Sequence, residues 1–321
     1  AAAADVLERS CMGAYADLQS AEFDAEKDVV IEELRISLDS PAEALDQGVW
    51  AAAFWQHPYR HPVIGWLDDL ERVTIDQMSA YYRSWYHPVN ANLVIAGDFD
   101  TQNTLKRVED LFGGIRPGAE PLPILLREAE QRGERRVIVK RAAEVERLQI
   151  AFHVPQVAHT DSATLQIVAA LLGEGTTSRL YQRLIERDRS AIRQSVDYTE
   201  RIDPGLFIVR IEVKPEGSLQ VVERATLEEI DRLTTAPVSE TELAKAKRVV
   251  SAQFILGQEE LANQAITLGL YETIKCFEHL SRFMPLIEQV TAEDVRLVAQ
   301  RYFGEDNRTV GYLVAEKASV K

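Results

Sequence analysis

The sequence has little sulfur and an excess of acidic side chains. Only two cysteines, Cys11 and Cys276, occur in 321 residues. They are too few for a disulfide framework, although one bridge in an oxidising compartment stays open. No apolar run approaches the roughly 18 residues that a membrane-spanning helix needs, so we expect no membrane span. The formal net charge is −15 and no basic stripe is present, so we expect no nucleic acid among the partners.

The chain also lacks a recognisable signal peptide. It opens on four alanines and continues directly into sequence typical of the middle of a domain, so we expect the natural start to lie further upstream. Its composition, 46% hydrophobic and 27% charged, is that of a soluble globular protein. The length predicts two domains. The acidity would suit a negatively lined chamber for basic peptides, but it commonly just confers solubility.

Residues 26–39 have the pattern of a partly apolar helix. Apolar side chains recur there at roughly helical spacing, and neither proline nor glycine interrupts them. Glu26 and Glu33 are seven positions apart, which places them two turns apart on one helix face. Two such acids are either a solvated charged edge or groups that point into a site. The pattern alone favours the solvated edge, because glutamate is seldom buried without a partner.

The order of motifs around this helix resembles the pitrilysin/insulinase family of zinc metallopeptidases, which includes mitochondrial processing peptidase and many small bacterial proteases. The resemblance is carried by the segments 26–34 (EKDVVIEEL), 57–65 (HPYRHPVIG) and 93–98 (LVIAGD), and by Thr74, Tyr82, Tyr86 and Asn90. It implies a Zn²⁺-dependent endopeptidase that hydrolyses bonds in peptides or unfolded segments. It also implies that Glu33 is the third zinc ligand, that Glu26 is a supporting acid of the catalytic site, and that the protein is bacterial and periplasmic or envelope-associated.

One part of the family's zinc site is missing from this sequence. The other two ligands and the catalytic base belong to an H-x-x-E-H motif, which the resemblance places upstream of residue 1. No two of the six histidines frame such a motif; they are His57, His61, His87, His153, His159 and His279. His57 and His61 have the spacing of a helical metal pair, but prolines on both sides predict a loop. We therefore expect the chain to be N-terminally incomplete and inactive alone.

A second departure concerns the grip on substrate. Active relatives carry an arginine and, seven residues on, a tyrosine in their second half, and these positions fall on Ile185 and Ile192 here. The resemblance then implies that a second peptidase-like subunit supplies this pair, in a heterodimer or a homodimer. The alternative is a non-catalytic subunit with a structural or substrate-holding role. Glu26 and Glu33 argue against that alternative, because a subunit without zinc has no chemical reason to keep them.

The fold class expected is α+β, built of two related modules in which helices pack on one side of a sheet, the first module being incomplete. We place the end of the first module at residues 1–115, a proline-rich linker at 116–134 and the second module at 135–321. An internal repeat supports this division: Thr74 and Thr291 each open a helix that is followed by an asparagine, Asn90 and Asn307, at the same spacing.

Strands are expected near residues 136–140, 147–153, 193–198, 206–213 and 309–314, and helices fill much of the remainder, starting with residues 5–19. In the second half, helix breaks are expected near Pro237, Gly257 and Pro285. Residues 92–97 form a further expected strand, whose edge would bind an extended peptide substrate by strand addition. The substrate-binding candidates there are Leu93, Val94, Ile95, Ala96 and Gly97.

Overall fold

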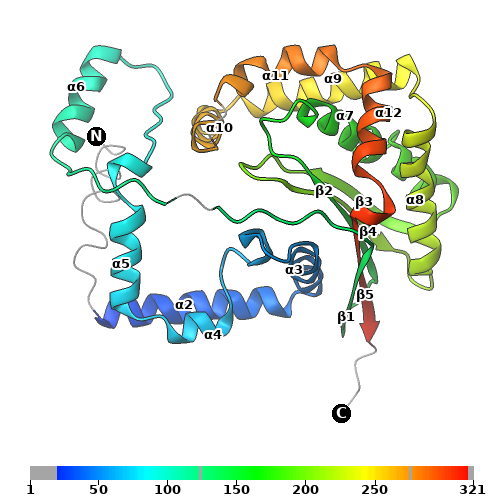
Figure 1. Cartoon of the computed structure of the whole chain (residues 1–321), viewed down its shortest axis with the longest axis horizontal. Coiled ribbons are helices and arrows are strands. Elements are labelled where there is room, and N and C mark those ends of the chain that lie inside the picture. Colours follow the sequence, from blue (N-terminus) through cyan, green and yellow to red (C-terminus); the bar gives the residue numbers. More distant parts are fainter. Residues whose placement is uncertain (1–19, 123–124, 275–276, 317–321) are drawn as a thin grey trace. The chain divides into compact units, whose positions relative to one another are not determined.

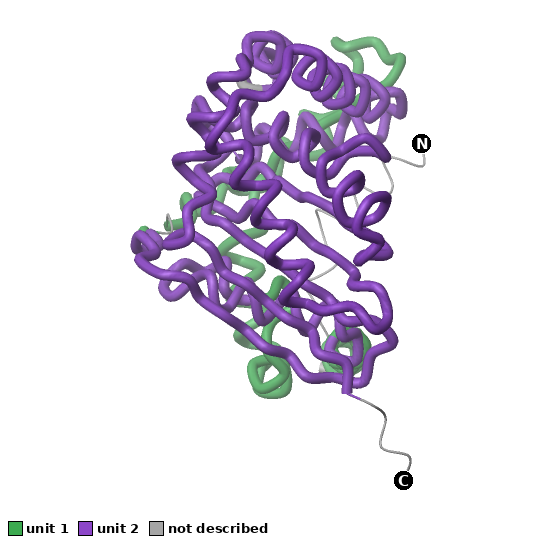
Figure 2. The backbone as a smooth tube through the Cα atoms, turned by 90° about the vertical axis from the view of Figure 1, so that its right-hand side faces the viewer, with its two compact units in different colours: residues 1–37, 62–125 green, residues 38–61, 126–321 purple. Residues whose placement is uncertain are grey.

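The computed structural model describes residues 20–122, 125–274 and 277–316. The chain divides into two compact units, unit 1 with residues 1–37 and 62–125, and unit 2 with residues 38–61 and 126–321 (Figure 2). Cys11, Cys276 and the helix expected at residues 5–19 lie outside the described residues. None of the described helices is long and apolar enough to cross a membrane.

The regular elements that the structure describes in unit 1 are all helices. Its elements are α2 (Ser20–Asp39, of which residues 20–37 belong to this unit), α4 (Leu67–Arg72), α5 (Ile75–Trp85), the short 3₁₀ helix η2 (Pro88–Asn90) and α6 (Thr101–Phe112). The expected start of α5 is confirmed: Thr74 and Gln77 form a capping box, each side chain accepting a hydrogen bond from the other's backbone N–H. Lys27 ties α2 to the end of α4 through the carbonyl oxygens of Glu71 and Val73.

The strand expected at residues 92–97 is not formed in the described structure. All five strands that the structure describes belong to unit 2. A strand needs a neighbour to satisfy its backbone N–H and C=O groups. Since no described part of unit 1 supplies one, this apolar segment does not become a strand. The prediction of a strand was wrong because it required a neighbouring strand, and local sequence does not reveal whether such a neighbour exists.

Unit 2 is built on a five-stranded sheet. The strands are β1 (Arg135–Ala142), β2 (Arg147–Val154), β3 (Ala191–Tyr198), β4 (Gly205–Val213) and β5 (Arg308–Glu316), in the spatial order β1-β5-β2-β4-β3 (Figure 1). The pair β1–β5 is parallel and the other neighbours are antiparallel. All five strands expected in the second half of the chain are confirmed, and so is the mixed helix-and-sheet fold class.

Helices cover one face of this sheet. They are α7 (Ser162–Gly173), α8 (Leu219–Thr235), α9 (Glu240–Gly257), α11 (Phe277–Gln289) and α12 (Ala292–Tyr302), while α10 (Leu261–Thr273) lies beside α11 (Figure 1). Alternate residues of the central strands point into this layer, because side chains alternate between the faces of a sheet. On β2 these are Leu148, Ile150 and Phe152, each 0% exposed.

The helix α3 (Pro41–Ala53) packs on the opposite face. Ser40 caps its start and Pro41 occupies the first turn. Its buried side chains meet the alternate residues of the strands, and together they form a second apolar cluster: Leu45, Val49, Ala53, Phe54, Ala151, Leu206, Ile208 and Leu313. The boundaries of the compact units therefore differ from the expected module boundaries, since α3 and residues 126–134 belong with the sheet.

One detail of the helical layer differs from expectation, and a second is an irregular helix. The breaks at Pro237 and Gly257 are confirmed, but Pro285 lies inside α11 rather than at a helix end. The segment after Arg179 forms η3 (Tyr181–Arg187), a π-helix rather than an α-helix, in which the N–H of Asp188 bonds to the carbonyl oxygen of Arg183 at 2.9 Å.

The internal repeat is confirmed at the level of hydrogen bonds. Thr291 starts α12 with a capping box as Thr74 does for α5. Asn90 donates from Nδ2 to the last carbonyl of α5, on Trp85, at 2.9 Å, and Asn307 donates likewise to Tyr302 at the end of α12, at 2.7 Å. Each asparagine thus satisfies a carbonyl that a helix end leaves without an intrahelical partner. Only the second copy continues into a paired strand.

Candidate functional site

The two acidic candidates lie on α2, as the sequence predicted. Glu26 and Glu33 are both exposed, and neither has a hydrogen bond or ion pair with any residue that the structure describes. The buried side of the same helix is apolar and includes Phe23, Ile31 and Leu34. The helix is therefore anchored by its apolar residues and leaves both carboxylates accessible.

These residues do not make a zinc site by themselves. No three histidine, cysteine, aspartate or glutamate side chains are grouped closely enough to hold a metal ion anywhere in the described parts of the chain. A catalytic zinc ion needs three protein ligands. Glu33 is the one residue in the described parts of the chain that the family resemblance implies as a ligand, and one carboxylate is too few, so the described residues do not fit the metal.

Three of the histidines have structural roles in unit 2. His57 is 3% exposed; its Nδ1 accepts a hydrogen bond from the N–H of Tyr59, and its Nε2 lies 3.4 Å from a carboxylate oxygen of Asp203. His61 ends the short 3₁₀ helix η1 (Pro58–Arg60). His153 is held by its Nε2, 2.9 Å from the carbonyl oxygen of Ala53. His57 and His61 flank a short 3₁₀ turn, so they do not share one face of an α-helix as a helical metal pair would, as expected.

Glu128 holds the segment that follows α3. Its two carboxylate oxygens accept hydrogen bonds from the backbone N–H groups of Trp55, Gln56 and His57 at 2.8–3.0 Å. Burial alone would raise the pKa of this carboxyl group, but the three backbone hydrogen bonds outweigh it and the pKa is lowered. The linker residue Glu128 is therefore part of unit 2.

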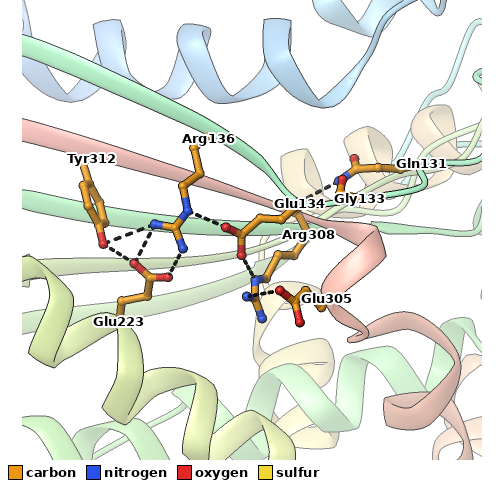
Figure 3. A network of polar contacts seen from close by, with 8 residues as sticks. All are labelled: Gln131, Gly133, Glu134, Arg136, Glu223, Glu305, Arg308 and Tyr312. Carbon is orange, nitrogen blue, oxygen red and sulfur yellow. Dashed lines mark hydrogen bonds and ion pairs between the residues drawn. The ribbon is translucent and has the colours of Figure 1, made fainter.

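A polar network joins the sheet to α8 (Figure 3). Arg136 on β1 forms a two-pronged pair with Glu223 on α8, which also accepts a hydrogen bond from the hydroxyl of Tyr312 on β5. Burial would raise the pKa of Glu223, but the hydrogen bonds from Arg136 and Tyr312 lower it. Glu134 extends the network by pairing with both Arg136 and Arg308. Every charge in it has an opposite partner, which indicates a structural rather than a catalytic role.

The substrate-gripping positions carry no polar group. Ile185 lies in η3 and packs half-buried against the main core, and Ile192 on β3 is 50% exposed. On unit 1, Leu93 and Ile95 are 43% and 40% exposed, in the segment that forms no strand. Among the polar candidates that the sequence pointed to, the exposed carboxylates of α2 are therefore the ones that the described structure leaves accessible.

Sequence reasoning did not identify Glu128 or the partners of Arg136. Glu128 stands in a segment with many charges, where nothing in the local pattern marks one carboxylate as bound. The turn-forming residues at 55–57, whose N–H groups need an acceptor, were the available signal.

Comparison with known proteins places the chain in a family. The family model described as "Peptidase M16 inactive domain" matches residues 72–250, more than half of the chain. The zinc protease PqqE of Helicobacter pylori is 26% identical over 302 residues, which cover 92% of this chain and 68% of that protein. An uncharacterized zinc protease of Mycobacterium tuberculosis is 27% identical over 285 residues. This chain spans 64% of the length of the mycobacterial protein, less than two-thirds.

The fold agrees with this assignment. The crystal structure of a protease from Helicobacter pylori superposes with a TM-score of 0.88 at 25% sequence identity, covering 93% of this chain and 73% of that one. The motif order, the sheet with its helical layer and the family match all point the same way. The chain therefore belongs to the M16, or pitrilysin, family of peptidases, and the region matched is that family's inactive domain.

Proposed function

We propose that the full-length protein is a subunit of a zinc-dependent endopeptidase that acts on peptides or unfolded segments. The observation that carries this proposal is the pair of exposed, unpaired carboxylates of Glu26 and Glu33 on α2, in a chain whose relatives are named zinc proteases. Both carboxylates lie on one face of the helix and have no internal partner to stabilise, so they are available to a function outside the described residues.

In this proposal Glu33 contributes one carboxylate ligand to the metal, and the remaining ligands come from residues outside this chain. Glu26, two turns earlier on α2, is a supporting acid that orients the site and adjusts its charge. Because Ile185 and Ile192 offer no polar group, a partner subunit supplies the arginine and tyrosine that hold the substrate. The assembly is then a heterodimer or a homodimer, and the periplasm or envelope of a bacterium is its proposed location.

The test is native mass spectrometry of the protein purified from its own source, which reports chain mass, bound metal and partner together. The proposal expects one zinc ion per chain, a polypeptide longer than 321 residues and a co-purifying peptidase-like subunit. Glu33→Gln in that full-length protein should lose zinc and peptide hydrolysis. Glu22→Gln, which changes another exposed acid on α2, should keep both. A source protein without zinc would rule out metal-dependent catalysis by this polypeptide.

The second candidate function is a non-catalytic subunit that holds substrate or supports a catalytic partner. The match to the inactive domain and the two isoleucines at 185 and 192 favour it. Under this alternative, Glu33→Gln and Glu22→Gln would both leave the activity of the purified complex unchanged.

We also propose that residues 93–97 bind an extended peptide by strand addition once a neighbouring strand is present. Leu93 and Ile95 are about two-fifths exposed, so side chains of the segment are accessible. Ala96→Pro removes a backbone N–H from this segment and should weaken peptide binding by the full-length protein. Unchanged peptide affinity in that variant would rule out the strand-addition role.

A further inference from the structure

A hollow of about 450 Å³ on unit 2 gathers four arginines. It lies between η3, the end of α8 and the start of α9, and its charged lining consists of Arg179, Arg183, Arg187, Arg232, Glu229 and Glu242. Two further carboxylates, Asp188 and Glu228, pair with Arg183 from outside the lining. What distinguishes the hollow is therefore the gathering of four arginine side chains rather than a net charge.

Two of the arginines are fixed in place by carboxylates. Arg179 donates from Nε and Nη2 to the two oxygens of Glu242, at 2.7 and 2.9 Å. Arg183 pairs with Asp188 at 2.6 Å and with Glu228 at 2.9 Å, two acids that do not line the hollow. Both side chains are only about one-fifth exposed. The two-pronged pair fixes the orientation of Arg179, and two separate acids hold Arg183.

The other two arginines have donors to spare. Glu229, whose side chain is 6% exposed, accepts a hydrogen bond from Nη1 of Arg232 at 3.0 Å. Among the described residues this is the one hydrogen bond that the Arg232 side chain makes. Arg187 has no hydrogen bond or ion pair with any described residue, although its side chain lines the hollow. These guanidinium groups can therefore donate to a ligand without breaking an internal contact.

The backbone beside the hollow is unusual. Gln182, Arg183 and Arg187 come from the π-helix η3, and such turns are frequent at functional sites. Arg189, just after it, has φ +51°, a left-handed conformation that costs a non-glycine residue energy. The local fold holds this basic segment in a shape that an ordinary α-helix would not give.

We propose that this hollow binds a phosphate group. The planar guanidinium fork matches the geometry of a phosphate oxyanion, and the side chain of Arg187 has no partner among the described residues that binding would displace. The group can come from free inorganic phosphate or from a phosphorylated side chain of a peptide. This inference is independent of the zinc chemistry proposed above, because the hollow belongs to unit 2 and shares no residue with α2.

Titration calorimetry with inorganic phosphate at low ionic strength tests the proposal on the full chain. We expect saturable binding that weakens as NaCl is added, because salt screens an exposed ion pair. Arg187→Gln and Arg232→Gln should each weaken it by roughly tenfold, the loss expected for one charge-assisted hydrogen bond. Arg224→Gln, an exposed arginine of α8 outside the hollow, should leave the affinity unchanged.

A second titration separates the two sources. A phosphoserine peptide that binds more tightly than inorganic phosphate, while its unphosphorylated form does not bind, would assign the hollow to a phosphorylated peptide. Tighter binding of inorganic phosphate would assign it to the free ion. The proposal is overturned if neither probe shows saturable binding, or if Arg224→Gln weakens binding as much as Arg187→Gln does. Thermal unfolding of each variant verifies that the fold is intact.

Discussion

Nε2 of His153 lies 2.9 Å from the carbonyl oxygen of Ala53, so the imidazole of β2 holds the last residue of α3 against the sheet. Since a carbonyl only accepts, this nitrogen carries the proton. Burial lowers the pKa of His153, although the carbonyl of Ala53 works in the opposite direction.

This contact predicts a pH-dependent stability. The unfolded chain, with a histidine pKa of about 6.5, binds a proton that the folded state resists. The free energy of unfolding should therefore fall as pH drops below about 6.5, and level off below the lowered pKa of the folded state. His153→Phe should remove that part of the slope in urea unfolding measured from pH 7.5 to 5. His61→Gln should keep it, and equal slopes in wild type and His153→Phe would contradict the assignment.

Glu128→Gln should destabilise unit 2 by about 1–2 kcal/mol, because an amide has one accepting oxygen where the carboxylate offers two for three N–H donors. The lowered pKa of Glu128 adds a pH dependence. Its stabilising effect is present above the unfolded pKa of about 4.3 and is lost as pH falls through the folded value. Urea unfolding at pH 7 and pH 4 measures both effects. The matched change Glu130→Gln, at a largely exposed side chain, should be close to neutral.

Gly311→Ala tests the packing of α3 on the sheet. A Cβ at residue 311 would lie 2.4 Å from Cγ2 of Val49 and 2.9 Å from Cδ1 of Leu45. The helix must then shift, which should cost about 1–3 kcal/mol of the free energy of unfolding. Gly304→Ala is the control, since nothing lies within 4 Å of its added Cβ. Equal stability of the two variants in chemical denaturation would show that α3 is not seated on β5.

Arg189→Gly should stabilise the protein. Its φ of +51° is costly for a residue with a Cβ and free for glycine, so a gain of roughly 1 kcal/mol is expected. Glu186→Gly, in the neighbouring π-helix, should lower stability instead, because glycine there only adds freedom to the unfolded chain. A melting temperature that falls in both variants would mean that contacts of the Arg189 side chain stabilise the fold by more than the strain of its positive φ destabilises it.

Local signals predicted much of this fold, and long-range contacts account for what they missed. Local sequence patterns located all five strands of unit 2, and Thr74 marked a helix start because its cap involves only the next turn. Pro285 was expected to break a helix, but Phe283 and Ile287 on either side of it are buried in the core. That burial outweighs the roughly 3 kcal/mol that an interior proline costs.

In the candidate site, too, local features could be predicted from the sequence and long-range contacts could not. The placement of Glu26 and Glu33 on one helix followed from their spacing, since seven residues are two helical turns. The partners of Glu128 and of Arg136 lie far away along the chain, and a single sequence does not show which distant groups meet. The strand expected at residues 92–97 failed for the same reason.

The position of β5 between β1 and β2 has a consequence for how the protein is made. These two early strands leave the ribosome some 150 residues before the strand that joins them. At about 5–20 residues per second, β1 would wait roughly ten to thirty seconds with its edge open. An open edge is a site for wrong pairing between chains. Nascent unit 2 should therefore depend on chaperones until residue 316 has emerged.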